Sequence, residues 1–375
     1  MRLLSLLFAL LLPAMVGAQA LPQPSGVAAR AWLLLDYGSG LSLAGANVDQ
    51  RVEPASLTKL MTAYVSFAAL KQGRIQAKQS VPVSERAWKS PGSRMFVEPR
   101  LAVNVDELLR GMIVQSGNDA CIALAELIAG SEDAFVQMMN GEAQRLGLAH
   151  THFTNSTGLP DPQHYSTAND LGRLALALIR DFPEYYTLYS LKDFRYNGIT
   201  QPNRNRLLWL DASVDGVKTG HTEAAGFCLI ASAKRGPRRL ISVVLGTDSD
   251  SARAQESQKL LNFGFQYYDA VKVYDGRQAI ARLRIFKGEE NAVAVGFAND
   301  LLISVPRGLS AQLKVQLQPQ QPLLAPLAAG SRVATLKLSL GDRPYGEFPV
   351  VTLENVAAAG IIGRAWDSIR LLFEK

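Results

Sequence analysis

The sequence predicts an α+β domain, an antiparallel sheet with helices, followed by a small all-β domain and a C-terminal amphipathic helix. Short apolar segments separated by turn residues lie near both ends of residues 21–270, with helical periodicity between them. From residue 271 to 355, apolar and polar residues alternate as in half-buried strands. Residues 356–375 return to helical spacing. A chain of 375 residues is also long enough for two domains.

The N-terminus has the pattern of a secretory signal peptide. Arg2 precedes an apolar run over residues 3–12, Pro13 ends that run, and residues 18–20 form a small-residue cleavage site. The apolar run is shorter than a bilayer span requires. We therefore expect residues 1–20 to be removed and the protein to be exported to the periplasm.

The composition excludes one class of partner. Lys and Arg outnumber Asp and Glu by 39 to 33, which gives a formal net charge of +6. These cations are scattered and no basic run with interleaved aromatic residues occurs, so we expect no nucleic-acid binding. Cys121 and Cys228 are the only cysteines and each lies among apolar residues, which predicts two free, buried thiols.

The first domain begins with a predicted hairpin, because residues 30–36 and 41–44 are apolar and glycine-containing turn residues separate them. Residues 55–70 have helical spacing, and Pro54 precedes them as a start signal. Asn104 is expected to cap the next helix. Further helices are expected at residues 104–114, 119–130, 132–146, 168–180 and 252–268. Strands are expected at residues 215–221, 226–233 and 240–245, with a hairpin turn near Gly236.

The second domain and the C-terminus differ in the spacing of their apolar residues. Residues 313–317 and 336–340 alternate between apolar and polar side chains, which predicts strands on either side of a Pro- and Gln-rich stretch. At the C-terminus, apolar residues fall at i, i+4, i+7 and i+11 of a helix: Ile362, Trp366, Ile369 and Phe373. An exported chain with such a terminal helix is expected to attach to a membrane surface through it.

A nucleophile and a base occur together at the start of the 55–70 helix. Lys59 lies three positions after Ser56, so their side chains share one face of a helix. A serine hydroxyl is a poor nucleophile until a neighbour takes its proton. A lysine takes this role when burial or a second cation lowers its pKa toward neutrality. The spacing therefore predicts nucleophilic catalysis by Ser56 with Lys59 as the base.

Two further motifs follow in the chain. Ser116-Gly117-Asn118 lies on a connection between two apolar helices, and Lys218-Thr-Gly lies within the strand predicted at residues 215–221. With Ser56-Leu-Thr-Lys, they have the order of the penicilloyl-serine transferases, so the first domain resembles the penicillin-binding-protein and β-lactamase-like transpeptidase fold. Within that group the chain resembles the D-alanyl-D-alanine carboxypeptidases of peptidase family S11, the low-molecular-weight penicillin-binding proteins. The segments that carry this resemblance are residues 53–61, 116–121, 203–209 and 215–222.

The resemblance implies five catalytic residues. Ser56 attacks the carbonyl of the D-Ala-D-Ala bond, and Lys59 accepts its proton. Lys218 is a second cation that lowers the pKa of Lys59. Ser116 links the two lysines and helps to protonate the departing amine, while Asn118 holds the substrate amide. Gly117 replaces the Asp of the general motif, as is typical of the carboxypeptidases.

The same resemblance implies the substrate-binding residues. Thr219 and Arg204, beside Lys218 and Gly220, receive the terminal carboxylate of the peptide, and the backbone N–H groups of Ser56 and His221 receive the developing oxyanion. The expected function is serine-type removal of the terminal D-alanine from peptidoglycan stem pentapeptides. β-Lactam antibiotics are expected to acylate the same serine. No cofactor and no metal are expected, and the expected location is the outer face of the inner membrane.

Three alternatives stay open at this point. A class A-like β-lactamase needs an added base for deacylation, and Glu184 does not match that pattern. His221 with Asp170 or Asp215 suggests a Ser-His-Asp triad, although the Ser56–Lys59 pair already supplies a base. A non-catalytic cell-wall scaffold is the third alternative, and it does not explain why Lys59 is present.

Overall fold

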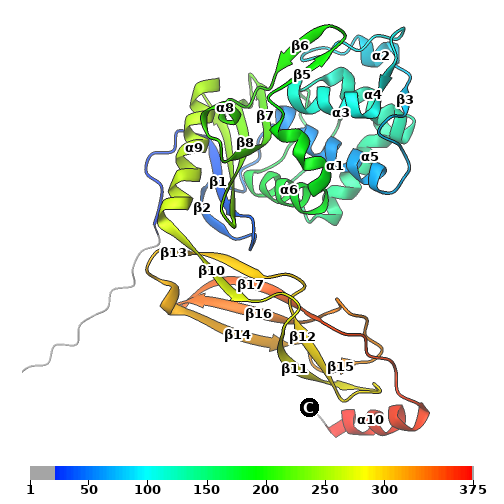
Figure 1. The fold of residues 1–375 in the computed structure, drawn as a ribbon, viewed down its shortest axis with the longest axis vertical. Helices are drawn as coiled ribbons and strands as arrows, with labels where there is room; N and C mark the ends of the chain where they lie inside the picture. The colour runs from blue at the N-terminus through cyan, green and yellow to red at the C-terminus, as the bar shows by residue number, and fades with distance from the viewer. Residues whose placement is uncertain (1–21, 374–375) are drawn as a thin grey trace, which may run out of the picture.

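The computed structural model describes residues 22–373, so the predicted signal peptide lies outside the described residues. Figure 1 shows an upper domain of helices and one sheet, an elongated lower domain of strands, and helix α10 at its far end. The predicted fold class is confirmed. The boundary drawn from the sequence at residue 270 falls inside strand β10, Tyr268–Tyr274, which belongs to the lower domain.

The sheet of the upper domain joins the two ends of that domain. Its antiparallel strands run in the order β2 (Ser42–Ala46), β1 (Ala31–Asp36), β9 (Arg238–Thr247), β8 (Gly226–Arg235) and β7 (Val214–Thr222). Strand β1 is buried along its whole length. Leu33 and Leu35 pack toward the main helical cluster, while Trp32 and Leu34 pack with residues of the opposite face. Both faces are therefore covered, and β7 is left as an edge strand.

Helices cover the two faces of this sheet unequally. Helix α9 (Asp250–Tyr267) and the short helix α8 (Leu207–Leu210) lie on one face, and the other helices of this domain gather at the opposite face (Figure 1). Those helices are α1 (Lys59–Lys71), α2 (Glu85–Trp88), α3 (Val105–Arg110), α4 (Asn118–Ala129), α5 (Glu132–Arg145), α6 (Ala168–Asp181) and α7 (Pro183–Tyr186). The predicted helices are all present, with ends shifted by a few residues.

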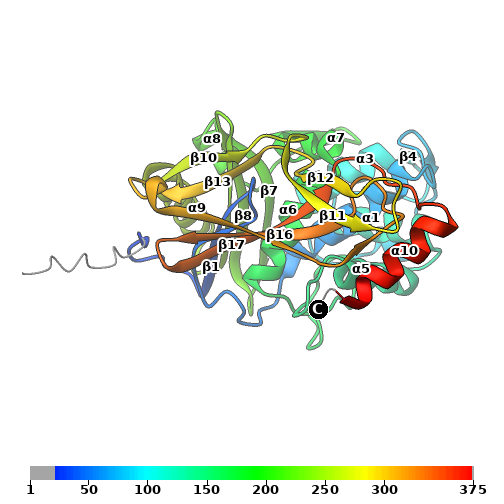
Figure 2. The same ribbon diagram turned by 90° about the horizontal axis from the view of Figure 1, so that it is seen from below.

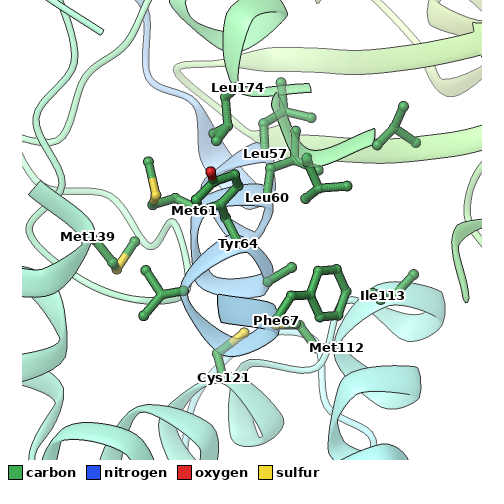
Figure 3. Packing of buried hydrophobic residues seen from close by; sticks show 14 of the residues in the cluster. Leu57, Leu60, Met61, Tyr64, Phe67, Met112, Ile113, Cys121, Met139 and Leu174 are labelled. Atoms are coloured by element: carbon green, nitrogen blue, oxygen red, sulfur yellow. The ribbon is translucent and has the colours of Figure 1, made fainter. Parts of the chain in front are cut away.

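Helix α1 is the central helix of the upper domain. It is apolar on almost every side, which is why it lies inside the helical cluster and not on its surface. Figure 3 shows its side chains surrounded by residues from several other helices, among them Met112, Cys121, Met139 and Leu174. Cys121 and Cys228 are free and buried, as predicted. The first turn of α1 is consequently held on all sides.

Helix α3 begins as predicted but ends differently. The Asn104 side chain accepts from Glu107 N at 3.0 Å and Glu107 Oε2 accepts from Asn104 N at 2.9 Å, which completes a capping box. After Arg110 the chain widens into a π-helical turn, Gly111–Gln115, and then Ser116 adopts a left-handed φ of 68°. π-Helical turns occur frequently at functional sites. Here the turn directs Ser116 out of the helix axis.

The lower domain is a strand domain with its own core. Its main sheet has the order β14 (Leu313–Pro319), β16 (Arg332–Leu340), β17 (Arg343–Thr352), β12 (Ala292–Gly296), β11 (Ala279–Phe286) and β15 (Leu323–Leu324). Strand β10 pairs separately with β13 (Leu301–Pro306). The alternation over 336–340 is confirmed by burial of its leucines, but Val315 is 42% exposed because β14 is an edge strand.

The sequence analysis did not predict two short antiparallel strand pairs. These are β3 (Ser80–Val81) with β4 (Val103–Asn104), which are distant in the chain, and the hairpin of β5 (Asp193–Tyr196) with β6 (Ile199–Pro202). Asn197-Gly198 connects β5 to β6, and both residues have positive φ. An Asn-Gly pair between strand-like segments is a strong hairpin signal. This signal was present in the sequence.

Helix α10 (Ile361–Phe373) packs against one end of the lower domain. Figure 2, seen from below, shows it beside β11, and Lys287 N donates to Asp367 Oδ2 at 2.6 Å. The helical spacing predicted for the C-terminus is confirmed. The exposed large apolar residues of α10 are Ile361, Ile362, Trp366, Ile369 and Leu372. None of the helices in residues 22–373 has the length and apolar character to cross a membrane.

Candidate active site

A cleft of about 660 Å³ opens between the edge strand β7 and the start of α1. It is lined by six of the residues selected from the sequence: Ser56, Ser116, Arg204, Thr219, Gly220 and His221. Three more selected residues, Lys59, Asn118 and Lys218, lie buried directly behind this lining. The structure therefore brings together all nine residues, which come from four separate segments of the chain.

Ser56 lies on a short 3-10 turn, Ala55–Thr58, that leads into α1. Ala55 before it has a φ of 47°, an unfavourable conformation for a residue with a Cβ, and such strain is concentrated at functional sites. Lys59 Nζ lies 3.0 Å from Ser56 Oγ. The predicted pairing of hydroxyl and amine is therefore present at hydrogen-bond distance.

Two other groups fix the Lys59 amine. It donates to Asn118 Oδ1 at 2.8 Å and to the Thr157 carbonyl at 2.5 Å. The Asn118 amide nitrogen in turn donates to the Pro91 carbonyl at 2.7 Å. Asn118 thus holds the lysine in place, a role that the sequence did not indicate.

The turn that carries Thr157 is built by its own side chains. Asn155 Oδ1 accepts from the backbone of Thr157, Gly158 and Leu159 at 2.7 to 3.2 Å. Gly158 has a φ of 83°, and a Cβ there would lie 1.8 Å from the Ala55 carbonyl oxygen. Only glycine fits between this turn and the nucleophile segment. The sequence analysis assigned no function to this turn.

Ser116 contacts one of the two lysines. Lys218 Nζ donates to Ser116 Oγ at 3.0 Å and to the Thr219 carbonyl at 3.1 Å. Asp119 fixes the neighbouring loop, since its buried carboxylate accepts from the backbone N–H groups of residues 95, 96 and 97. Ser116 therefore lies at the Lys218 side of the cleft, while Asn118 bonds Lys59.

Burial shifts both lysines toward the neutral form. Desolvation, with a smaller contribution from Arg204, lowers the pKa of Lys59 from its usual value to about 8. Burial and then the neighbouring cations Lys59, Arg204 and Arg253 lower the pKa of Lys218 well below its usual range. Of the two causes that the sequence analysis allowed, burial and a second cation, burial is the main one for Lys59. For Lys218, repulsion from Lys59 adds to the effect of burial.

This pKa predicts the pH dependence of acylation. Lys59 accepts a proton only in its neutral form, so kcat/KM is expected to rise about tenfold per pH unit below pH 8 and to level off above it. Stopped-flow acylation with a chromogenic β-lactam across pH 5.5–10 measures the profile. An inflection near pH 6.5 would instead assign the base to a histidine.

Strand β7 approaches the nucleophile closely. A Cβ on Gly220 would lie 3.1 Å from the Pro54 carbonyl oxygen and 3.3 Å from Leu57 N, so glycine permits the edge strand to pass beside Ser56. His221 lies on the cleft wall with its ring 4.0 Å from that of Phe227. The backbone of β7 at His221 is thus placed next to the reacting serine.

The proposed triad partners of His221 are occupied elsewhere. Asp215 accepts from Tyr186 Oη at 2.9 Å and pairs with Arg239 at 2.7 Å. Asp170 accepts from His150 N and from Thr151 Oγ1, both at 2.8 Å. Neither carboxylate orients His221, so the geometry supports the Ser56–Lys59 pair instead.

Positive charge gathers on one wall of the cleft. Arg204 and Arg206 line it, as does Arg253, which is buried and donates to the Gly220 carbonyl at 3.1 Å. Arg253 also pairs with Asp250. Guanidinium groups bind carboxylates with two parallel hydrogen bonds. This wall is suited to an anionic group beside Thr219.

Comparison with known proteins gives the family. Residues 18–249 match the family model described as D-alanyl-D-alanine carboxypeptidase, and residues 268–358 match that of the penicillin-binding protein 5 C-terminal domain. The chain belongs to the D-alanyl-D-alanine carboxypeptidase family. The resemblance drawn from the motifs is therefore confirmed, and the family is one of enzymes. This carboxypeptidase family member thus matches the family models of both the peptidase domain and the C-terminal domain.

Individual relatives cover nearly the whole chain. The D-alanyl-D-alanine carboxypeptidase DacC of Escherichia coli is 42% identical over 97% of this chain and 93% of its own length. The crystal structure of penicillin binding protein 5 from Haemophilus influenzae is 41% identical, with a TM-score of 0.80 over 89% of this chain and 99% of that one. Penicillin-binding protein D2 from Listeria monocytogenes, solved in an ampicillin-bound form, matches 64% of this chain at 29% identity and a TM-score of 0.59.

Proposed function

We propose that this chain removes the terminal D-alanine from peptidoglycan stem peptides through an acyl-enzyme on Ser56. The observation that carries the proposal is the buried Lys59 amine, with a pKa lowered to about 8, at 3.0 Å from the Ser56 hydroxyl. Protonated Lys59 has three N–H donors, one for each of its acceptors: Ser56 Oγ, Asn118 Oδ1 and the Thr157 carbonyl. Neutral Lys59 has two N–H donors and one lone pair. That lone pair faces Ser56, since Asn118 and Thr157 accept the remaining N–H groups.

The proposed reaction has two steps. Neutral Lys59 takes the Ser56 proton as Oγ attacks the carbonyl carbon, and backbone N–H groups of Ser56 and His221 bind the oxyanion. The C–N bond then breaks, and the proton that Lys59 accepted passes by way of Ser116, beside Lys218, to the departing D-alanine amine, which leaves Lys59 neutral again. Water next attacks the Ser56 ester, and its proton passes to Lys59 and from there to Ser56 Oγ, which frees the shortened peptide and regenerates the serine.

The positive wall of the cleft supports recognition of a free C-terminus. Arg204 and Thr219 would bind the terminal carboxylate, beside Lys218. A peptide ending in D-Ala-D-Ala is expected to release D-alanine at least about a hundredfold faster than the same peptide with a C-terminal amide, because the amide cannot pair with a guanidinium. Chromatographic quantification of the released D-alanine or D-alanine amide makes the comparison. Equal rates for the two peptides would contradict the recognition of the terminal carboxylate by Arg204 and Thr219.

Acylation by β-lactams follows from the same geometry. A strained lactam carbonyl next to Ser56 Oγ meets the same base and the same N–H groups as the peptide carbonyl. A relative in this fold has been solved with ampicillin bound. The β-lactamase alternative gains no support, because Glu184 is exposed on α7 and is not part of the cleft lining.

We further propose that the protein is exported to the periplasm and lies on the outer face of the inner membrane through α10. The apolar side chains of α10 are uncovered, with Ile362 87% exposed and Trp366 57% exposed. Helices of this kind lie in the interfacial plane. A variant that ends at Ala359 is expected to move from the membrane fraction to the soluble fraction, as immunoblots of fractionated cells would show. Sedimentation of that variant with membranes would contradict the anchor.

A further inference from the structure

A second cavity, of about 430 Å³, lies next to the groups that hold the catalytic lysine. It is lined by α2, the segment that follows α2, and the 155–159 turn. Six residues of its lining enter the argument: Arg86, Lys89, Ser90, Pro91, Glu132 and Thr157. The reaction proposed above assigns no role to this cavity.

Two consecutive hydrogen bonds connect the wall of this second cavity to Ser56. The Thr157 carbonyl accepts from Lys59 Nζ at 2.5 Å, and Lys59 lies 3.0 Å from Ser56 Oγ. On the other side, the Pro91 carbonyl accepts from the Asn118 amide at 2.7 Å. The second cavity therefore lies on the side of the cleft where Asn118 is buried behind the lining. The arginine wall that suits the terminal carboxylate is formed by other residues, from the 203–206 segment and α9.

A peptide bound for cleavage extends in this direction. Its terminal carboxylate occupies the arginine wall and its scissile carbonyl lies at Ser56, so the preceding residue must continue away from that wall. One extended residue spans about 3.5 Å. A side chain on the residue before the two D-alanines is thus within reach of the second cavity, beyond Asn118.

The second cavity contains side-chain N–H donors that are available to a ligand. Arg86 uses one of its nitrogens on the buried Glu132, at 2.5 Å, and a guanidinium has five N–H donors. The other oxygen of Glu132 accepts from Ser156 N and Oγ, so this carboxylate is committed to the protein. Lys89 pairs with the exposed Glu85 and lies over the Trp88 ring, and exposed ion pairs of this kind contribute little free energy.

A buried hydroxyl completes the donor set. Ser90 is 3% exposed, and its Oγ has no hydrogen-bond partner in the described part of the chain. A buried polar atom without a partner is uncommon and indicates a group still to be bound. Two cations and one unpartnered hydroxyl favour an acceptor that carries negative charge.

We propose that this second cavity is a subsite for a carboxylate on the side chain of the residue that precedes the D-alanines. The inference rests on the proposed function, since it takes the peptide direction from the reaction at Ser56. Lys89 and Arg86 attract the carboxylate, and Ser90 donates to it. The subsite makes the enzyme selective for stem peptides with an anionic or zwitterionic side chain at that position.

Three peptides test the subsite. They end in D-Ala-D-Ala and differ only in the preceding residue, which is α-aminoadipate, norleucine or lysine. The wild type is expected to favour the aminoadipate peptide over the norleucine peptide in kcat/KM by about fivefold or more, the size of one partly exposed charge pair. Lys89→Glu reverses the charge at a side chain that is 63% exposed, so it leaves the fold intact. It is expected to make the lysine peptide the preferred one.

Lys78→Glu is the matched control, because Lys78 is 82% exposed and lies outside both cavities. It should keep the wild-type order of the three peptides. An order that is the same in the wild type and in Lys89→Glu would overturn the subsite. Absence of D-alanine release from all three peptides would overturn the proposed reaction itself, which separates the two failures.

Discussion

Replacement of Ser56 by alanine is expected to lower D-alanine release by a factor of about 10⁴ or more, because no other nucleophile lies beside the base. The hydroxyl is the atom that forms the ester, and its removal leaves the binding groups of the cleft in place. Release from a D-Ala-D-Ala peptide, followed with a coupled D-amino-acid oxidase assay, measures the loss. The KM, where turnover is still detectable, should change little.

The matched control for this variant is Ser80→Ala, at an exposed position on β3 outside the cleft. It should retain wild-type activity. If Ser56→Ala unfolds at the same temperature as the wild type, its loss of activity is due to the missing hydroxyl and not to a damaged fold. Residual release above a hundredth of the wild-type rate would mean that a different group, or an activated water, performs the attack.

Replacement of Lys59 by arginine is the second large effect, an expected fall in kcat of about 10³-fold. A guanidinium keeps its proton at every accessible pH, so it cannot accept one from Ser56. Lys59 is also fully enclosed, at 1% exposure, and the larger planar group does not fit between Asn118 and Thr157. Acylation by a chromogenic β-lactam should slow in proportion.

Lys71→Arg provides the control on the same helix, since Lys71 is exposed at the far end of α1 and donates only to the Asp181 carbonyl. Its activity should match the wild type. If Lys59→Arg kept a tenth or more of the activity, proton removal by this side chain would be ruled out. Raising the pH should not rescue this variant, because the guanidinium stays charged.

The sequence predicted the framework well, for physical reasons that can be named. Helix α1 is apolar on almost every side, so its pattern identified both the core and the position of Ser56. Asn104 with Glu107 gave a cap that depends only on local spacing. The antiparallel hairpin of β8 and β9 followed from strand periodicity and the turn at Gly236. In each case the signal was contained in a short segment.

Contacts between distant segments could not be predicted in this way. Thr157 acts through its backbone carbonyl, 98 positions from Lys59, and any residue type supplies such a carbonyl. Asp119 acts through backbone N–H groups of the 95–97 loop, which leave no mark in the sequence. The cause of the Lys59 pKa was likewise hidden, because burial depends on the packed fold and not on motif spacing.

The edge strands show a second limit. Period-two alternation in residues 313–317 predicted a strand but not its place at the edge of the sheet, which leaves Val315 exposed. The β7 strand is also an edge strand, and there it passes beside the segment that carries Ser56. Strand order depends on contacts far apart in the chain, so the same local pattern gives an exposed surface in one domain and a catalytic wall in the other.

The most direct test of the central claim is the mass of the trapped acyl-enzyme. The mature protein is mixed with excess penicillin, quenched in acid, and examined as intact protein and as peptides. The proposed reaction predicts one added penicilloyl group, on the peptide that contains Ser56, and none in Ser56→Ala. An adduct on another residue, or no adduct while D-alanine release continues, would contradict a serine acyl-enzyme at this site.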